Sequence, residues 1–161
     1  MFSEDKMKSH SRNAKKLDRK RVLICLIMFF ALLPVFSYLH EAGHALVCIA
    51  DGNEAEISVN FNGGTTLCHG DISNPFPYKI SGGLLAGIIG TTVGIALFRW
   101  KIPFIALTTI GAGHLINAVI ETFADSYFTH GAEWSLFLGL VEFVTFFSLM
   151  IIFDRKTVRA V

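Results

Sequence analysis

The hydrophobic residues of this chain lie in four long blocks that are separated by short polar stretches. The blocks cover about residues 22–50, 80–98, 102–124 and 135–153. Each block holds roughly 19 to 29 residues, and about 20 apolar residues suffice for a helix to cross the hydrocarbon of a bilayer. The pattern therefore predicts an all-α membrane protein with about four transmembrane helices.

The polar stretch between the first two blocks has a different period. Ile57 and Val59 alternate with polar residues, and residues 62–64 read Asn-Gly-Gly, which is a turn signal. An apolar residue at every second position indicates a strand with one buried face. We therefore expect a short β element, a hairpin or an edge strand, in the loop that follows the first helix.

Composition sets the protein apart from soluble domains. The chain has 161 residues, of which 52% are hydrophobic and only 17% are charged. An ordinary soluble domain of this size needs more polar surface than that. The chain divides into a basic leader at residues 1–21, a membrane domain at 22–153 and a short tail at 154–161.

Basic residues are concentrated on one side of the predicted topology. With four spans, the leader, the link between the second and third blocks and the tail share a side, and they carry every lysine and arginine except Lys79. Positive residues mark the cytoplasmic side of a membrane protein. We expect a multi-pass protein of the cell membrane with both termini in the cytoplasm. Contact with lipid headgroups explains the basic leader, so no nucleic-acid partner is expected.

The three cysteines have neither metal-binding nor redox spacing. Cys25 and Cys48 fall in the first block, and Cys68 falls in the loop that follows it. No CxxC pair is present. The sequence therefore predicts neither a cysteine zinc site nor a disulfide framework.

The end of the first block contains three ionisable residues in the order His40-Glu41-Ala42-Gly43-His44. Residues four apart share one face of a helix, so His40 and His44 can bind the same metal ion. Neutral imidazole is a good zinc ligand, and a glutamate beside the first histidine can take a proton from a water that zinc activates. Ionisable groups in an apolar helix are costly unless they are paired or bind a metal. We therefore expect one zinc ion.

The third block carries a polar stripe. His114, Asn117, Glu121 and Asp125 follow one another at spacings of three, four and four, which places them on one side of a helix. A polar stripe on a membrane helix faces the protein interior. At a helix rise of 1.5 Å per residue, His40 lies about 27 Å along the first block, between the depths of Asn117 and Asp125 in the third. The two halves of a metal site can therefore meet.

In these motifs the chain resembles the site-2 protease family of intramembrane zinc metalloproteases. Residues 39–46 read Leu-His-Glu-Ala-Gly-His-Ala-Leu, and residues 81–87 read Ser-Gly-Gly-Leu-Leu-Ala-Gly, similar to the small-residue opening of that family's next helix. Asn117 and Asp125 keep the eight-residue spacing of the family's Asn…Asp-Gly motif, although its prolines are absent and Ser126 replaces its glycine. The fourth block lies outside the resemblance.

The resemblance implies an enzyme that hydrolyses peptide bonds in or near the transmembrane segments of other proteins. His40, His44 and Asp125 would hold one zinc ion, and Glu41 would act as the catalytic base. Asn117 would contact the substrate or the transition state. The expected partners are a membrane-protein substrate and the lipid bilayer, and a homo-oligomer is compatible with the sequence.

The third zinc ligand has a second interpretation. Glu121 and Asp125 have the ExxxD spacing of metalloproteases in which the glutamate binds the metal. Asp125 would then support a histidine through a hydrogen bond instead of binding zinc itself. Asp125 is the preferred ligand, and Glu121 is the alternative.

Two other classes of function fit parts of the pattern. A non-catalytic membrane protein of the same fold could bind zinc or a partner, but zinc binding alone does not require Glu41. A scaffold or transporter subunit could use the polar stripe to pack helices or to line a pathway. Glu142, in the fourth block, is expected to face the interior of the bundle as a packing or gating group.

Overall fold

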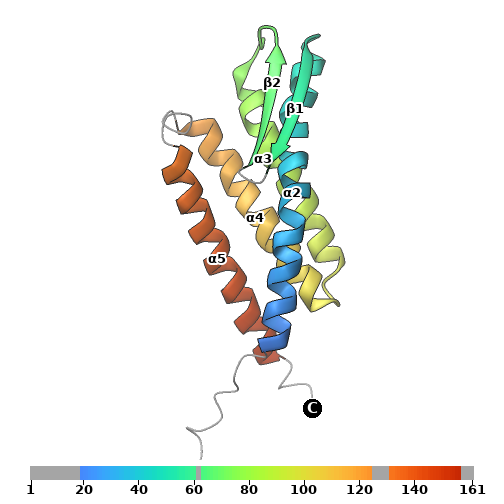
Figure 1. Cartoon of the computed structure of the whole chain (residues 1–161), viewed down its shortest axis with the longest axis vertical. Coiled ribbons are helices and arrows are strands. Elements are labelled where there is room, and N and C mark those ends of the chain that lie inside the picture. The colour runs from blue at the N-terminus through green and yellow to red at the C-terminus, as the bar shows by residue number, and fades with distance from the viewer. Residues whose placement is uncertain (1–18, 61–62, 125–130, 157–161) are drawn as a thin grey trace, which may run out of the picture.

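The computed structural model of this protein describes residues 19–60, 63–124 and 131–156. The elements in these residues are α2 (Arg19–Ala50), β1 (Glu54–Asn60), β2 (Gly63–His69), α3 (Pro75–Ala96), α4 (Lys101–Phe123) and α5 (Gly131–Lys156). The helices form a bundle, and the hairpin of β1 and β2 stands at one end of it (Figure 1).

All four helices are long and apolar enough to cross a membrane, which agrees with the four hydrophobic blocks. The largest difference at a helix start is at α3, which begins at Pro75, about five residues before the expected start near residue 80. The Asn74 side chain accepts a hydrogen bond from the backbone nitrogen of Phe76 at 3.0 Å. Such a cap stabilises a helix start, and a proline in the first turn sacrifices no helical hydrogen bond.

The two strands pair as an antiparallel hairpin, which confirms the small β element predicted from the sequence. The register pairs Glu54 with His69 at one end and Asn60 with Gly63 at the other. Between α2 and β1 the chain reverses at Gly52, whose φ is 85°. Residues with a Cβ rarely adopt a positive φ, so glycine suits this position. The reversal brings both strands back against α2.

Small residues allow α3 to pack closely against its neighbours. The buried residues of α3 are Gly82, Gly83, Ala86, Gly87, Gly90 and Gly94. A methyl group added at Gly83 would lie 2.6 Å from the backbone nitrogen of Ala118 on α4. Glycine and alanine at such an interface allow two helix backbones to approach in a membrane protein. The close contact between α3 and α4 fixes the position of the polar stripe on α4.

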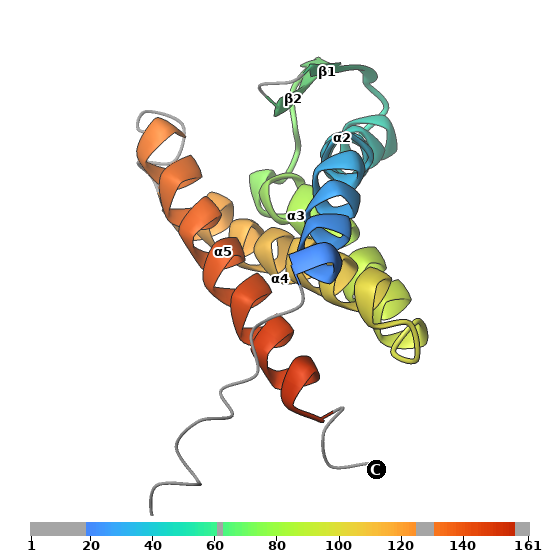
Figure 2. The same cartoon turned by 60° about the horizontal axis from the view of Figure 1, so that its bottom comes forward.

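The last helix packs against α2 at one end of the bundle and diverges from it at the other. Phe146 and Met150 of α5 join Cys25 of α2 and Phe104 of α4 in one buried cluster. Toward the hairpin, α5 moves away from α2 (Figures 1 and 2). The bundle is therefore closed at the end away from the hairpin.

A disulfide joins Cys48 of α2 to Cys68 of β2, with Cα atoms 5.8 Å apart. The sequence predicted no disulfide framework, and this single crosslink was not foreseen. The two residues are 20 apart in sequence and become neighbours only because the chain reverses at Gly52 and the hairpin folds back. A crosslink over a loop of this length stabilises the fold by about 3 kcal/mol, and it fixes the hairpin to α2.

Candidate metal centre and active site

Two histidines of α2 lie one helical turn apart with their ring nitrogens close together. The Nε2 atoms of His40 and His44 are 3.1 Å apart. Both residues are buried, with 8% and 4% of their surface exposed. The four-residue spacing thus places two nitrogen donors on one side of the helix, as the sequence predicts.

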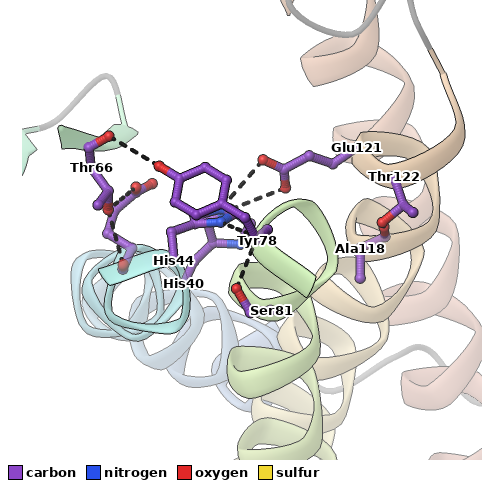
Figure 3. Close-up of polar contacts among 9 residues, drawn as sticks. His40, His44, Thr66, Tyr78, Ser81, Ala118, Glu121 and Thr122 are labelled. Atoms are coloured by element: carbon purple, nitrogen blue, oxygen red, sulfur yellow. Dashed lines mark hydrogen bonds and ion pairs between the residues drawn. The ribbon is translucent and has the colours of Figure 1, made fainter. Parts of the chain in front are cut away.

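Glu121 of α4 brings a carboxylate to these two histidines. Its Oε1 lies 3.3 Å from Nε2 of His44, and its Oε2 lies 3.4 Å from Nε2 of His40 (Figure 3). The donor atoms of the three residues lie within 4.8 Å of one another, so the group could hold a metal ion. Asp125, the preferred third ligand from the sequence, lies outside the described residues. Glu121, the alternative, is the carboxylate that the fold places beside the histidines.

A backbone carbonyl at the start of α3 orients His44. The Nδ1 atom of His44 lies 2.7 Å from the carbonyl oxygen of Tyr78. A carbonyl oxygen only accepts hydrogen bonds, so Nδ1 carries the proton. The neutral ring then turns the lone pair of Nε2 toward His40 and Glu121. Histidines that bind metals are commonly oriented by such a bond from the other ring nitrogen.

The cluster offers two imidazole nitrogens and a carboxylate, a donor set that can hold a metal ion. Zinc binds histidine nitrogen and carboxylate oxygen at about 2.0–2.2 Å in a tetrahedron, so neighbouring ligand atoms lie about 3.3–3.6 Å apart. The Nε2 atoms of His40 and His44 are 3.1 Å apart, and each lies 3.4 or 3.3 Å from a different oxygen of the Glu121 carboxylate. Oε2 of Glu121 is also buried without a hydrogen-bond partner among the described residues. A buried carboxylate oxygen without a partner is costly, and a bound cation would remove that cost.

The carboxylate of Glu41 is held beside the cluster by the hairpin. Oγ1 of Thr66, on β2, lies 2.8 Å from Oε2 and 2.9 Å from the backbone oxygen of Glu41, and its single proton can be donated to either. Gly64 provides the space, because a methyl group at that position would lie 2.8 Å from Oε1 of Glu41. Oε1 has no hydrogen-bond partner among the described residues, and Glu41 is only 7% exposed. A buried, oriented carboxylate with one uncommitted oxygen is suited to proton transfer.

Two glycines allow α3 to approach the histidine pair. A methyl group at Gly43 of α2 would lie 2.7 Å from the Cα of Gly82. A methyl group at Gly82 would in turn lie 2.8 Å from Cδ2 of the His44 ring and still closer to Nε2. Neither position accepts a side chain unless α2, α3 or the His44 ring moves.

We expect Gly82→Ala to weaken metal binding at this cluster about 10- to 100-fold, because the added methyl displaces the ring of His44, and lost support of a ligand costs about that much in affinity. Competition with a chromophoric chelator measures the affinity. Gly139→Ala on α5 is the matched control, since nothing lies within 4 Å of a Cβ there. Equal affinities of the two variants would contradict the position of His44 against α3.

A cleft of about 830 Å³ opens beside the cluster. His40 and Glu41 of α2 line it on one side, and Asn117 of α4 and Glu142 of α5 line it on others, with Gly64 of the hairpin at its edge. Clefts that bind ligands commonly have volumes of about 300–1,000 Å³. A bound molecule in this cleft would therefore reach a candidate metal ligand and Glu41 at once.

Two residues of the polar stripe, Asn117 and His114, line this cleft. Asn117 is 8% exposed, and its Oδ1 has no hydrogen-bond partner among the described residues. The ring of His114 packs against those of His40 and Phe36, with centroids 5.4 and 6.0 Å away. Asn117 thus lines the cleft with a buried acceptor that lacks a partner in the described part of the chain, whereas His114 packs against His40.

The sequence did not indicate the groups that orient the cluster. Tyr78 acts through its backbone carbonyl, and Thr66 acts through a hydroxyl on a short strand. Neither role has a sequence signature. Gly82 and Gly83 did offer a signal, because adjacent glycines in an apolar block indicate that another backbone passes close by.

No protein-family model, curated protein or solved structure matches this chain. The resemblance to the site-2 protease family therefore rests on the motif residues alone. Of these, residues 39–46 and 81–87 contain the histidine pair, Glu41 and the glycine that packs on His44.

Proposed function

We propose that this chain is a zinc-dependent intramembrane metalloprotease that hydrolyses peptide bonds in or near the transmembrane segments of other membrane proteins. The observation that carries the proposal is the juxtaposition of three elements. A buried His40–His44–Glu121 cluster lies next to the oriented carboxylate of Glu41, and both border one cleft. Zinc binding without catalysis would need only the first of these elements.

The residues of the cluster have separate roles in this proposal. His40, His44 and Glu121 would hold zinc, which when bound supplies a Lewis acid that acidifies a water and polarises the substrate carbonyl. Glu41 would accept a proton from the attacking water at Oε1 and pass it to the nitrogen of the leaving amine. Thr66 would keep the carboxylate in place through its bond to Oε2, 2.8 Å long.

The cleft would bind the substrate in an extended form. A helix buries its peptide bonds in internal hydrogen bonds, so a transmembrane segment must unwind locally before cleavage. The two-stranded sheet of the described residues offers outer strand edges with which an extended segment could pair. The amide of Asn117 would hydrogen-bond the segment near the cleaved bond, because it lines the cleft with its Oδ1 unpartnered among the described residues.

The helices would lie in the cell membrane with both termini in the cytoplasm. The distribution of lysine and arginine supports this orientation. The disulfide of Cys48 and Cys68 supports it independently, because it lies at the hairpin end and disulfides persist in oxidising compartments.

The proposal is tested by mapping new protein termini in membranes of host cells that express the chain. Mass spectrometry of labelled amino termini should find cleavage sites in or near transmembrane segments. 1,10-Phenanthroline should abolish these cleavages, and excess zinc should restore them, because zinc supplies the Lewis acid. Termini that form equally fast with the chelator, or only far from transmembrane segments, would contradict the proposal.

A further inference from the structure

Glu142 of α5 lines the cleft, at a position that the proposed chemistry does not use. It packs directly against Gly113 of α4, where an added methyl group would lie 2.9 Å from its Cδ and 2.8 Å from its Cγ. The absence of a side chain at Gly113 therefore provides the space that the Glu142 carboxylate occupies. The contact fixes the carboxylate at the depth of Gly113 along α4.

The Glu142 carboxylate has no hydrogen bond or ion pair with any other described residue. The described residues that line the cleft include two carboxylates, those of Glu41 and Glu142, and no lysine or arginine. A carboxylate within an apolar helix is costly and normally has a partner or a function. Its natural partner is a group on the molecule that occupies the cleft.

A second group in the cleft points to the same kind of ligand. Asn117 is more than nine-tenths buried, and its Oδ1 lacks a partner among the described residues. The α4 and α5 walls of the cleft therefore each carry a group without a partner among the described residues, a buried amide oxygen on α4 and the Glu142 carboxylate on α5. A molecule that brings donors to these walls would be favoured, and an aliphatic side chain would leave the acceptors desolvated.

The depth of Glu142 fixes its distance from the metal centre along the substrate. Gly113 precedes Glu121 by eight residues, which corresponds to about 12 Å along α4 at 1.5 Å per residue. An extended peptide covers about 3.3 Å per residue, so 12 Å spans three to four residues. The carboxylate would thus meet a substrate side chain three or four positions from the cleaved bond.

We propose that Glu142 forms a subsite that binds a lysine or arginine side chain of the substrate segment, three or four residues from the cleaved bond. This inference rests on the proposed function. Basic residues are rare within membrane segments because they are costly there. The subsite would therefore distinguish the few segments that carry one from the many that are purely apolar.

Binding of model peptides tests the subsite without relying on cleavage. The full-length Glu41→Gln variant, loaded with zinc in nanodiscs, is titrated with fluorescent single-span peptides of leucine and alanine. One series carries a single lysine at successive positions, and matched series carry methionine or glutamate there. Peptides with lysine at one register should bind at least about tenfold more tightly than the methionine peptides, as expected for a close charge pair.

Replacing the charge of Glu142 tests whether this residue causes the preference for lysine peptides. Adding Glu142→Gln should bring the lysine and methionine peptides to within about twofold, and Glu142→Lys should favour the glutamate series instead. Glu133→Gln is the matched control, since it removes an exposed carboxylate of α5 that does not line the cleft, and it should keep the lysine preference.

Three results would overturn the subsite: a lysine preference that survives Glu142→Gln, no preference at any position, or no binding of any peptide. Failure of the proposed function looks different. In that case the lysine preference depends on Glu142, yet the zinc-loaded chain with Glu41 intact cleaves none of the bound peptides.

Discussion

Replacing Glu41 by glutamine should lower the rate of substrate cleavage about 10²- to 10⁴-fold while zinc remains bound. General-base catalysis contributes a factor of that size. Glutamine keeps the size of the side chain and can still accept the hydrogen bond that Thr66 donates to Oε2, so the fold should survive. Glu41 is not one of the three clustered metal donors among the described residues, so the metal content should not change. The measurements are zinc per chain and the cleavage rate of a substrate identified from its new terminus.

The matched control is Glu56→Gln, which removes a carboxylate of the hairpin whose side chain is 74% exposed. It should cleave at the wild-type rate. Cleavage by Glu41→Gln at an undiminished rate would remove Glu41 from the mechanism. If Glu41→Gln instead supports the full biological role and neither protein cleaves anything, the chain is a non-catalytic zinc- or partner-binding protein.

Replacing Glu121 by alanine should weaken zinc binding more than about 100-fold. Even residues that only support a ligand contribute about 10- to 100-fold to metal affinity, so a ligand should contribute more. Glu121 supplies the only carboxylate of the candidate cluster in the described residues. Its removal leaves two histidines, which rarely hold zinc tightly. Zinc affinity of the purified variant is measured by competition with a chromophoric chelator.

Asp125→Ala is the informative comparison, because Asp125 is the other candidate ligand in the sequence. Removing a residue that only supports a histidine lowers zinc affinity by at most about 100-fold. Asp125→Ala should therefore bind zinc more tightly than Glu121→Ala. The opposite order, with zinc retained in Glu121→Ala and lost in Asp125→Ala, would show that Asp125 is the third zinc ligand.

Hydropathy predicted the four helices because each contains a long apolar block, and the alternating residues predicted the β element because a strand with one buried face repeats every two residues. The residues at which the helices begin were harder to predict from the sequence. Pro75 was expected to precede the second helix and instead lies in its first turn, where the cap at Asn74 decides the boundary. The pairing of Cys48 with Cys68 was missed because it depends on how the hairpin folds back, which residue spacing does not encode.

The third ligand shows the limit of periodicity. Glu121 and Asp125 are four residues apart in the sequence, and a helical repeat places residues four apart on one side, so periodicity cannot choose between them. What distinguishes Glu121 is the close packing of α4 on α3 through residues such as Gly83, together with the rotation of α4 about its axis. These are properties of the tertiary structure. The contact between the Tyr78 carbonyl and His44 also depends on the tertiary structure, so periodicity could not predict it.

Zinc K-edge X-ray absorption on the purified, metal-loaded chain tests the proposed metal centre most directly. The proposed centre predicts two imidazole ligands and only nitrogen or oxygen neighbours at about 2.0–2.2 Å, since His40, His44 and Glu121 supply the ligands. The same spectrum from Glu121→Ala should change or vanish. A sulfur shell at about 2.3 Å, fewer than two imidazoles, or a spectrum unaffected by Glu121→Ala would contradict it.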